Sequence, residues 1–250
     1  MSVTFETKVW EKDYEIILKS GRLQNMIHRC HYPFKEKKLF INNVNNLGKA
    51  QRLADKLISQ SVIDEYVIVE SLANEVLDFF ELSKKSLGKG YYYSIAELTS
   101  IYLCTSKYLL HFSGDSIPMR NTQHQWLCHL LQKMESNSQI CVANLLWNRK
   151  TNEAINESLE HDSQFCIGYG FSDQMYLIRT EEFRRPIYNE HNEKSSHYPD
   201  YGGELFEKRV NSWMLNHNRY RATYLGLSYK HRNFSKKKWV MQLNQLFDWQ

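Results

Sequence analysis

Several features that mark large classes of protein are missing from this sequence of 250 residues. No eighteen apolar residues run together, and the start, MSVTFETKVWEKDYE, has no apolar stretch behind a basic segment. We therefore expect no membrane-spanning helix, no secretory leader and a cytoplasmic location. The five cysteines are scattered without a C-x-x-C pair, so we expect free, buried thiols in a reducing compartment.

Charge and glycine patterns exclude further classes. The 32 basic and 28 acidic residues leave a net charge of +4, which does not by itself indicate a nucleic-acid-binding protein. Neither G-x-G-x-x-G after a strand nor G-x-x-x-x-G-K-[ST] occurs, so a dinucleotide oxidoreductase and a P-loop NTPase are unsupported. With only 4 prolines and 10 glycines, no linker or low-complexity segment is visible, which predicts one domain over residues 1–250.

What the sequence does contain is an alternation of β-rich and amphipathic runs. In the first half, strands are predicted at 3–10, 38–44, 65–71 and 108–115, with helical segments at 11–30, 47–60 and 91–106. This order is typical of an α/β fold with a parallel sheet and right-handed crossovers. In the second half, further strands are predicted at 140–148, within 165–185, and from 219, the last being followed by a loop that contains His231.

Polar residues stand where the predicted strands end. In open α/β sheets the ligand lies beyond the carboxyl ends of the strands, so these tips are candidates for a site. Each residue alone is equally consistent with a cap or a turn, but four tips at one edge favour a ligand. Because no P-loop is present, a divalent cation is the expected holder of any phosphates. The tip residues are Thr7, Trp10, Asn42, Asn43, Glu70, Ser113 and Asp115.

The strand order, with YLLHFSGD as the fourth strand, resembles that of nucleotide-sugar-dependent glycosyltransferases of the GT-A (Rossmann-like) fold, in particular inverting ones. In that family the fourth strand ends in Asp-x-Asp, which holds Mn²⁺ or Mg²⁺ on the donor pyrophosphate. Here Ser113 stands in place of the first acid, and Asp115 matches the second. The resemblance implies that Asp115 contacts the metal and that Ser113 binds the ribose or a metal-bound water.

Two further stretches extend the resemblance. YPDYGGELFEKRVNSWML is similar to the Gly-Glu-Asp turn that supplies the acceptor-activating base, which implies a catalytic role for Glu204. An ordinary carboxylate at a helix N-terminus is the alternative, and Asp173 in GFSDQ is the second candidate for the base. We expect Glu207 and Arg209 to face solvent or pair with neighbours. His231 resembles the C-terminal residue that completes the metal shell, the alternative being an uninvolved surface histidine.

The resemblance implies transfer of a sugar, with inversion, from a nucleoside diphosphate sugar to a hydroxyl of a carbohydrate or glycolipid acceptor, in polysaccharide or glycoconjugate synthesis. Residues 1–118 would bind the nucleotide and residues 119–250 the acceptor. FSKKKWVMQLNQLFDW predicts a C-terminal helix that docks on the core or makes a peripheral membrane contact.

Two other classes stay open. Aromatic residues interleaved with Lys and Arg in NRYRATYLGLSYKHRNFSKKKW are also typical of a non-catalytic nucleic-acid-binding or nucleotide-binding protein, although we expect no specific nucleic-acid partner. A sugar nucleotidyltransferase would show a glycine-rich loop after the first strand, and ETKVWEKDYE contains no glycine.

Overall fold

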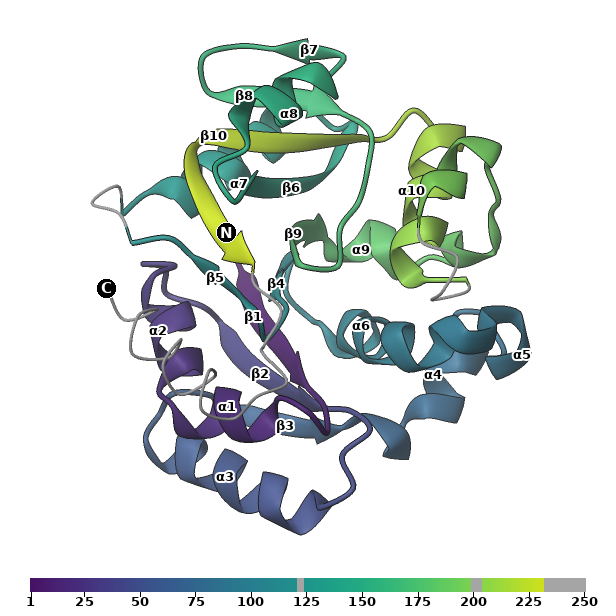
Figure 1. Ribbon diagram of the computed structural model, residues 1–250. Coiled ribbons are helices and arrows are strands. Elements are labelled where there is room, and N and C mark those ends of the chain that lie inside the picture. Colours follow the sequence, from purple (N-terminus) through teal and green to yellow (C-terminus); the bar gives the residue numbers. More distant parts are fainter. Residues whose placement is uncertain (121–123, 199–203, 232–250) are drawn as a thin grey trace.

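The computed structural model describes residues 1–120, 124–198 and 204–231, and within them one sheet organises the chain (Figure 1). The strands lie in the order β3-β2-β1-β4-β9-β6-β10-β8-β7, with β5 paired to β10. Their bounds are β1 Val3–Val9, β2 Glu36–Ile41, β3 Glu65–Ile68, β4 Tyr108–Phe112, β5 Ser116–Pro118, β6 Ile140–Trp147, β7 Glu160–His161, β8 Phe165–Gly168, β9 Met175–Arg179 and β10 Tyr220–His231.

Helices connect and cover these strands. The α-helices are α1 Tyr14–Lys19, α2 Arg22–His28, α3 Leu47–Ser59, α4 Ala73–Phe79, α5 Lys84–Leu87, α6 Tyr91–Leu103, α7 Trp126–Ser136, α8 Thr151–Asn156, α9 Thr180–Phe183 and α10 Phe206–Asn216. Short 3₁₀ turns occupy Val69–Ser71, Gly88–Gly90, Ile187–Asn189 and Glu193–His197.

The sheet is mixed. β1 pairs in parallel with β2 and β4, β2 with β3, and β6 with β10. β9 runs antiparallel between β4 and β6, and β5 and β8 run antiparallel to β10. The predicted α/β class with a mixed, mainly parallel sheet flanked by helices is therefore confirmed.

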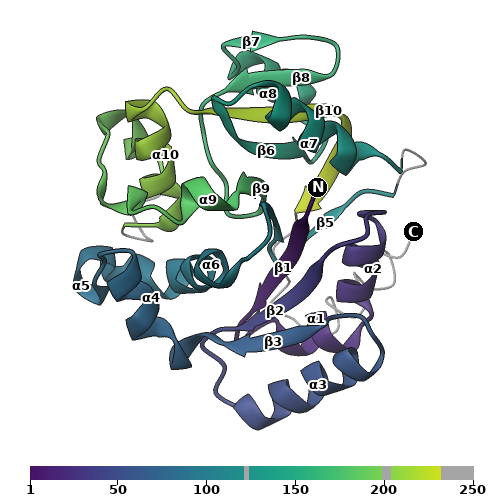
Figure 2. The ribbon, with the colours of Figure 1, turned by 180° about the vertical axis from the view of Figure 1, so that it is seen from behind.

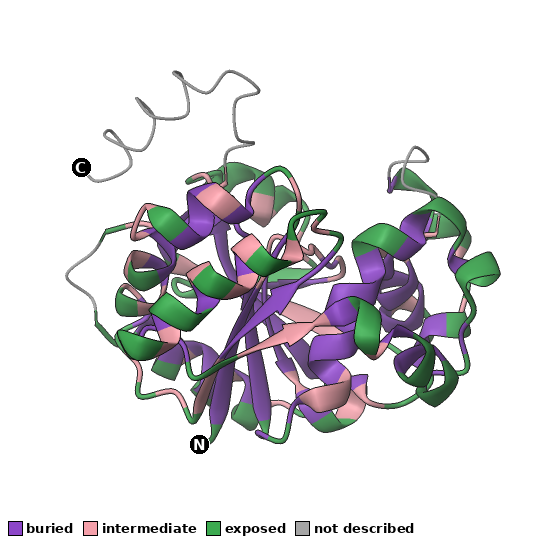
Figure 3. Cartoon of the chain, turned by 90° about the horizontal axis from the view of Figure 1, so that it is seen from below, coloured by how far each residue is buried: buried purple, intermediate pink, exposed green. Residues whose placement is uncertain are grey.

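Both faces of the sheet are buried, which explains the long apolar runs in β4, β6 and β9. In β2, Leu39 and Ile41 point into one core and Phe40 into the other, because successive side chains of a strand alternate. Helices α1, α2, α3 and α7 pack on the first face and α4, α6 and α10 on the second (Figures 1 and 2). Figure 3 shows the buried strands between helices whose outer sides are exposed.

The structure differs from the sequence prediction at several places. The helical segment at 11–30 is divided, because Gly21 at the start of α2 adopts a left-handed conformation with φ 71°. Helix α7 and strand β5 were not predicted, and His231 ends β10 and does not lie in a loop. The predicted C-terminal helix lies outside the described residues. No helix in the described ranges is both long and apolar enough to cross a membrane.

The turn after β4 is held tightly against α1 and α2. The carbonyl of buried Gly114 accepts a hydrogen bond from Arg22 Nε at 2.7 Å. A Cβ at position 114 would overlap Cδ1 of buried Ile17 and lie 3.2 Å from its Cγ1. The close approach of the Ile17 side chain of α1 therefore favours glycine here, and this contact helps to position the next residue, Asp115.

We expect Gly114→Ala to lower the free energy of unfolding by about 1–3 kcal/mol, since the added methyl overpacks a buried contact. Gly48→Ala is the matched control: Gly48 lies near the start of α3, where a Cβ would meet only Arg52 Nη1 at 3.7 Å. That variant should gain roughly 0.5 kcal/mol by restricting the unfolded chain. Urea unfolding measures both, and equal effects would contradict the packing described for Gly114.

Candidate active site

A cleft of about 950 Å³, here called the main cleft, opens at the carboxyl ends of β1, β2 and β4. The lining comes from six segments of the chain, and three of them, 8–13, 42–43 and 113–115, contain polar strand tips predicted from the sequence. A smaller cavity of about 440 Å³, the side pocket, adjoins it and shares Asn43 and Tyr92 with it. The described residues that line the main cleft are Lys8, Val9, Trp10, Glu11, Asp13, Asn42, Asn43, Lys89, Tyr92, Tyr93, Ser113, Gly114, Asp115, Asp173, Gln174 and His231.

Asp115 and His231 meet in the main cleft, although they come from opposite halves of the chain. Strand β5 follows the turn after β4 and pairs with the end of β10, so that Ser116 lies opposite His231. This pairing places Asp115 Oδ2 3.3 Å from His231 Nε2, and the Ser113 hydroxyl donates to Asp115 Oδ1 at 2.8 Å.

Ionisation of Asp115 is favoured by its neighbours. Burial is the largest influence and opposes ionisation, but the His231 imidazole and the Ser113 hydroxyl together outweigh it. They hold the pKa of Asp115 below its usual range. Asp115 is therefore a carboxylate at neutral pH, as a cation ligand must be.

The geometry of this pair fits a divalent ion. Two ligand atoms bound at right angles to one ion, each at about 2.1 Å, lie roughly 3 Å apart, close to the 3.3 Å between Asp115 Oδ2 and His231 Nε2. In the part of the chain that the structure describes, no group of three or more His, Cys, Asp or Glu side chains is arranged to hold a metal. An ion at this pair would take its remaining ligands from phosphate oxygens and water.

Of the other predicted tip residues, all but Thr7 line at least one of the two cavities. Trp10 is 42% exposed in the main cleft, and the Asn42 side-chain amide donates to the Tyr92 carbonyl at 3.1 Å. Glu70 lines the side pocket, with Asn43. Thr7 is fully buried, and its hydroxyl donates to the Phe112 carbonyl at 2.7 Å. Thr7 thus joins β1 to β4 and does not line the main cleft.

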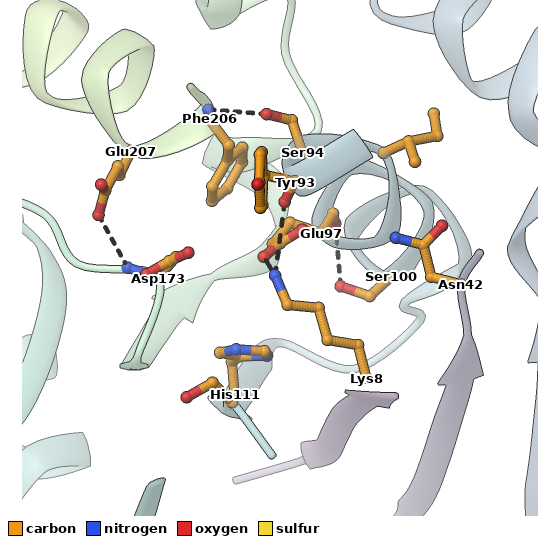
Figure 4. Close-up of polar contacts among 12 residues, drawn as sticks. Lys8, Asn42, Tyr93, Ser94, Glu97, Ser100, His111, Asp173, Phe206 and Glu207 are labelled. Carbon is orange, nitrogen blue, oxygen red and sulfur yellow. Dashed lines mark hydrogen bonds and ion pairs between the residues drawn. The ribbon is translucent and has the colours of Figure 1, made fainter. Parts of the chain in front are cut away.

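Sequence reasoning missed Lys8, which brings a positive charge into the main cleft (Figure 4). Its ammonium forms an ion pair with Glu97 of α6, which is only 1% exposed, and lies 3.4 Å from the Tyr93 carbonyl. A signal was present: Thr4, Glu6 and Lys8 alternate along a strand buried on both faces, where polar side chains need partners.

Glu6 is the centre of a buried polar network behind the main cleft. Its carboxylate lies 2.6 Å from His111 Nδ1 and accepts hydrogen bonds from Ser100 at 3.2 Å and Tyr176 at 3.4 Å. The His111 ring stacks on Tyr176. The network joins Ser100 of α6 and His111 of β4 to Glu6 of β1, so it holds α6 against β1 and β4.

Asp13 was also missed, because it occupies no recognised motif. It is 8% exposed, lines the main cleft, and accepts a hydrogen bond from the Trp10 backbone N–H at 2.8 Å. Burial raises the pKa of Asp13 to about 7; the charge of Asp115 adds to this rise, while the Trp10 amide and Lys8 oppose it.

Of the two candidates for the base, Asp173 lines the main cleft. Its backbone N–H points toward Glu207 Oε2 of α10 at 3.4 Å (Figure 4). Burial, together with the negative charge of Asp173, raises the pKa of Glu207 well above its usual range.

The expectation that Glu207 and Arg209 face solvent is wrong. Glu207 is partly buried, and Arg209 is buried with its guanidinium bonded to the Tyr188 carbonyl.

Glu204 has a different environment. Its carboxylate pairs with Lys208 one helical turn later at 2.8 Å, and its side chain is 43% exposed. It is absent from the described lining of the main cleft. Gly202 and Gly203, which carry the resemblance at this turn, lie outside the described residues, so the role of Glu204 stays a prediction.

The basic and aromatic segment that suggested nucleic-acid binding is, as far as residue 231, mainly strand β10 in the centre of one half of the sheet. Tyr224 and Tyr229 are buried, so their rings are not available for stacking on bases.

Comparison with solved structures identifies the fold. A mannosyltransferase from Pyrobaculum calidifontis, solved with GDP-mannose and Mn²⁺, matches with TM-score 0.57 and 10% identity over 98% of this chain and 60% of that one. Glucosyl-3-phosphoglycerate synthase from Mycobacterium tuberculosis, solved with Mn²⁺, UDP and glucosyl-3-phosphoglycerate, matches with TM-score 0.51 and 12% identity over 99% and 78%. The chain has the GT-A fold.

The sequence itself gives no comparable match. No protein-family model matches the chain, and no curated protein matches it. The chain spans 60% of the length of the mannosyltransferase.

We expect Asp13→Asn to change how stability depends on pH. A carboxyl whose pKa rises from 3.8 to about 7 on folding binds its proton more tightly in the folded protein. The folded protein therefore loses stability as pH rises from 3.8 to about 7. Over this range the contribution of Asp13 lowers the free energy of unfolding by up to about 1.4 kcal/mol per pH unit. In metal-free buffer, the stability of Asp13→Asn relative to the wild type should increase from pH 4 to pH 7 in urea titrations. A difference that stays constant would contradict the environment described for Asp13.

Proposed function

We propose that the protein is a glycosyltransferase that moves a sugar from a nucleoside diphosphate sugar to a hydroxyl of an acceptor. The supporting observation is the main cleft, in which the adjacent side chains of Asp115 and His231 and the carboxylate of Asp173 line one cavity of a GT-A fold. Solved proteins of this fold hold GDP-mannose with Mn²⁺ in one case and UDP with Mn²⁺ in another.

The first requirement of such a reaction is charge stabilisation at the leaving group. As the bond between the sugar C1 and the phosphate oxygen breaks, negative charge grows on the diphosphate. A bound Mn²⁺ or Mg²⁺ would supply positive charge there, and Asp115 and His231 are the residues that would hold it. Lys8 and Lys89 add two further cations to the lining of the cleft.

The second requirement is a base for the acceptor. We assign this role to Asp173, which lines the main cleft, in preference to Glu204, whose carboxylate pairs with Lys208. The acceptor oxygen bonds to C1, its proton passes to the Asp173 carboxylate, and the diphosphate departs with the electrons of the broken bond. One such displacement inverts the configuration at C1.

The nucleoside would occupy the side pocket and the adjoining wall of the main cleft. Trp10 and Tyr92 present exposed rings there, and Asn43 and Glu70 offer polar groups that can pair with a base or ribose. A carbohydrate or glycolipid acceptor, a role in polysaccharide or glycoconjugate synthesis and a cytoplasmic location belong to the same proposal.

Release of nucleoside diphosphate from a panel of UDP-linked and GDP-linked hexoses, with Mn²⁺ present, tests the proposal without an identified acceptor, because water can replace the acceptor. Asp173→Asn should lower the release rate by about 10²-fold or more, since the general base is lost.

Glu207→Gln is the matched control. Glu207 holds a proton near neutral pH, so the neutral, nearly isosteric amide should leave the rate within a few-fold of the wild type. If no nucleotide sugar is consumed, the proposed function is wrong. If Asp173→Asn keeps the wild-type rate, the function stands and the assignment of the base is wrong.

A further inference from the structure

A third cavity lies next to the main cleft and takes no part in the roles assigned so far. This β6–β10 cavity, of about 170 Å³, is lined by residues of β6 and β10, of α8 with the residues that flank it, and of the loop before β9. The loop before β9 connects the two spaces: Ser172 lines the β6–β10 cavity, Asp173 lines the main cleft, and Gln174 lines both. A molecule in the β6–β10 cavity therefore lies beside the proposed base.

Two side-chain amides present hydrogen-bond donors to this cavity. The Thr223 hydroxyl donates to Asn144 Oδ1 at 2.7 Å, and the Tyr229 hydroxyl donates to Gln174 Oε1 at 3.1 Å. Each amide oxygen is thus already engaged, which fixes the orientation of the amide. The NH₂ groups of Asn144 and Gln174 remain to donate to a ligand oxygen.

The charges around the cavity cancel in pairs. Lys150 lies 2.7 Å from Glu153, and Arg221 lies 3.8 Å from Glu157. An anionic ligand would have to compete with these carboxylates for the two cations. The hydroxyl groups of a neutral ligand can instead donate hydrogen bonds to the carboxylates and accept hydrogen bonds from the cations and the amides. The lining therefore favours a neutral polyhydroxylated molecule.

A flat apolar surface completes the cavity. The Trp147 ring is 36% exposed at the end of β6, and the Lys150 ammonium lies 3.8 Å from its centre. An aromatic ring beside oriented donors and acceptors suits a sugar, whose C–H groups pack on the ring while its hydroxyls take the hydrogen bonds.

We propose that the β6–β10 cavity binds an uncharged sugar ring of the acceptor, with Trp147 as its apolar platform and the amides of Asn144 and Gln174 as its donors. This inference rests on the proposed function and adds to it the place where the sugar ring of the acceptor binds and the absence of charge on that ring. Its reacting hydroxyl points past Gln174 toward Asp173, which takes the proton as the hydroxyl oxygen bonds to the donor C1.

Saturation-transfer NMR tests the inference with methyl glycosides of glucose, galactose and mannose as neutral probes and with glucuronic acid and glucose 6-phosphate as anionic ones. At least one neutral glycoside should bind the wild-type protein, and its affinity should fall by about tenfold in Trp147→Ala, as expected for loss of an aromatic contact. Trp10→Ala, which removes the exposed tryptophan of the main cleft, should keep the glycoside signal.

Binding of UDP or GDP with Mn²⁺ is measured on the same samples. The results therefore distinguish failure of the acceptor inference from failure of the proposed glycosyltransferase function. Nucleotide binding should be retained in Trp147→Ala, and thermal unfolding should show that this variant is folded. If the wild type binds a nucleotide but no neutral glycoside, if Trp147→Ala binds the glycoside normally, or if an anionic probe binds in preference, the acceptor inference is overturned. If neither nucleotide binds, the proposed function itself fails.

Discussion

The contact between Asp115 and His231 depends on how a short strand closes one side of the main cleft. β5 has three residues, and its antiparallel pairing with β10 brings the turn after β4 to the end of the last described strand. Without that pairing, Asp115 would lie in the turn after β4 without the His231 imidazole beside it. The fit of α1 against Gly114 and the bond from Arg22 hold the same turn from the other side.

The remaining charges of the main cleft lie around this contact. Asp13 is near enough to Asp115 for the charge of Asp115 to disfavour ionisation of Asp13, while Lys8 is paired with Glu97. Asp173 and Glu207 form a second pair of neighbouring carboxyl groups, in which burial assigns a proton to Glu207. A cleft with several carboxylates can hold a divalent cation, and that cation would offset the negative charge of a diphosphate donor.

Much of the fold could be predicted from the sequence because its central strands carry long apolar runs between clear helical segments. Apart from Thr7, the tip residues of those strands line the cavities at the edge of the sheet where they were expected. The Thr7 hydroxyl bonds instead to the Phe112 carbonyl of β4, and the alternation of side chains along β1 does not reveal such a contact. β5 is too short to leave a pattern, and its pairing with β10 depends on tertiary structure. α7 has an amphipathic pattern that the sequence does show, although no strand-end motif drew attention to it.

The candidate site was less predictable, for physical reasons. Lys8 and Asp13 acquire their importance from burial and from charges contributed by distant segments. Glu204 and Glu207 are one helical turn apart, and only the packing of α10 against the loop at Asp173 distinguishes their surroundings. Paired charges around the β6–β10 cavity come from residues that are unremarkable in the sequence.

The most direct test of the account is electron spin-echo spectroscopy of Mn²⁺ added to the protein with UDP or GDP. If Asp115 and His231 share the ion, the spectrum contains the nitrogen coupling of one directly bound imidazole, and His231→Gln removes that coupling. A wild-type complex without nitrogen coupling, or a coupling that survives in His231→Gln, would contradict the central claim.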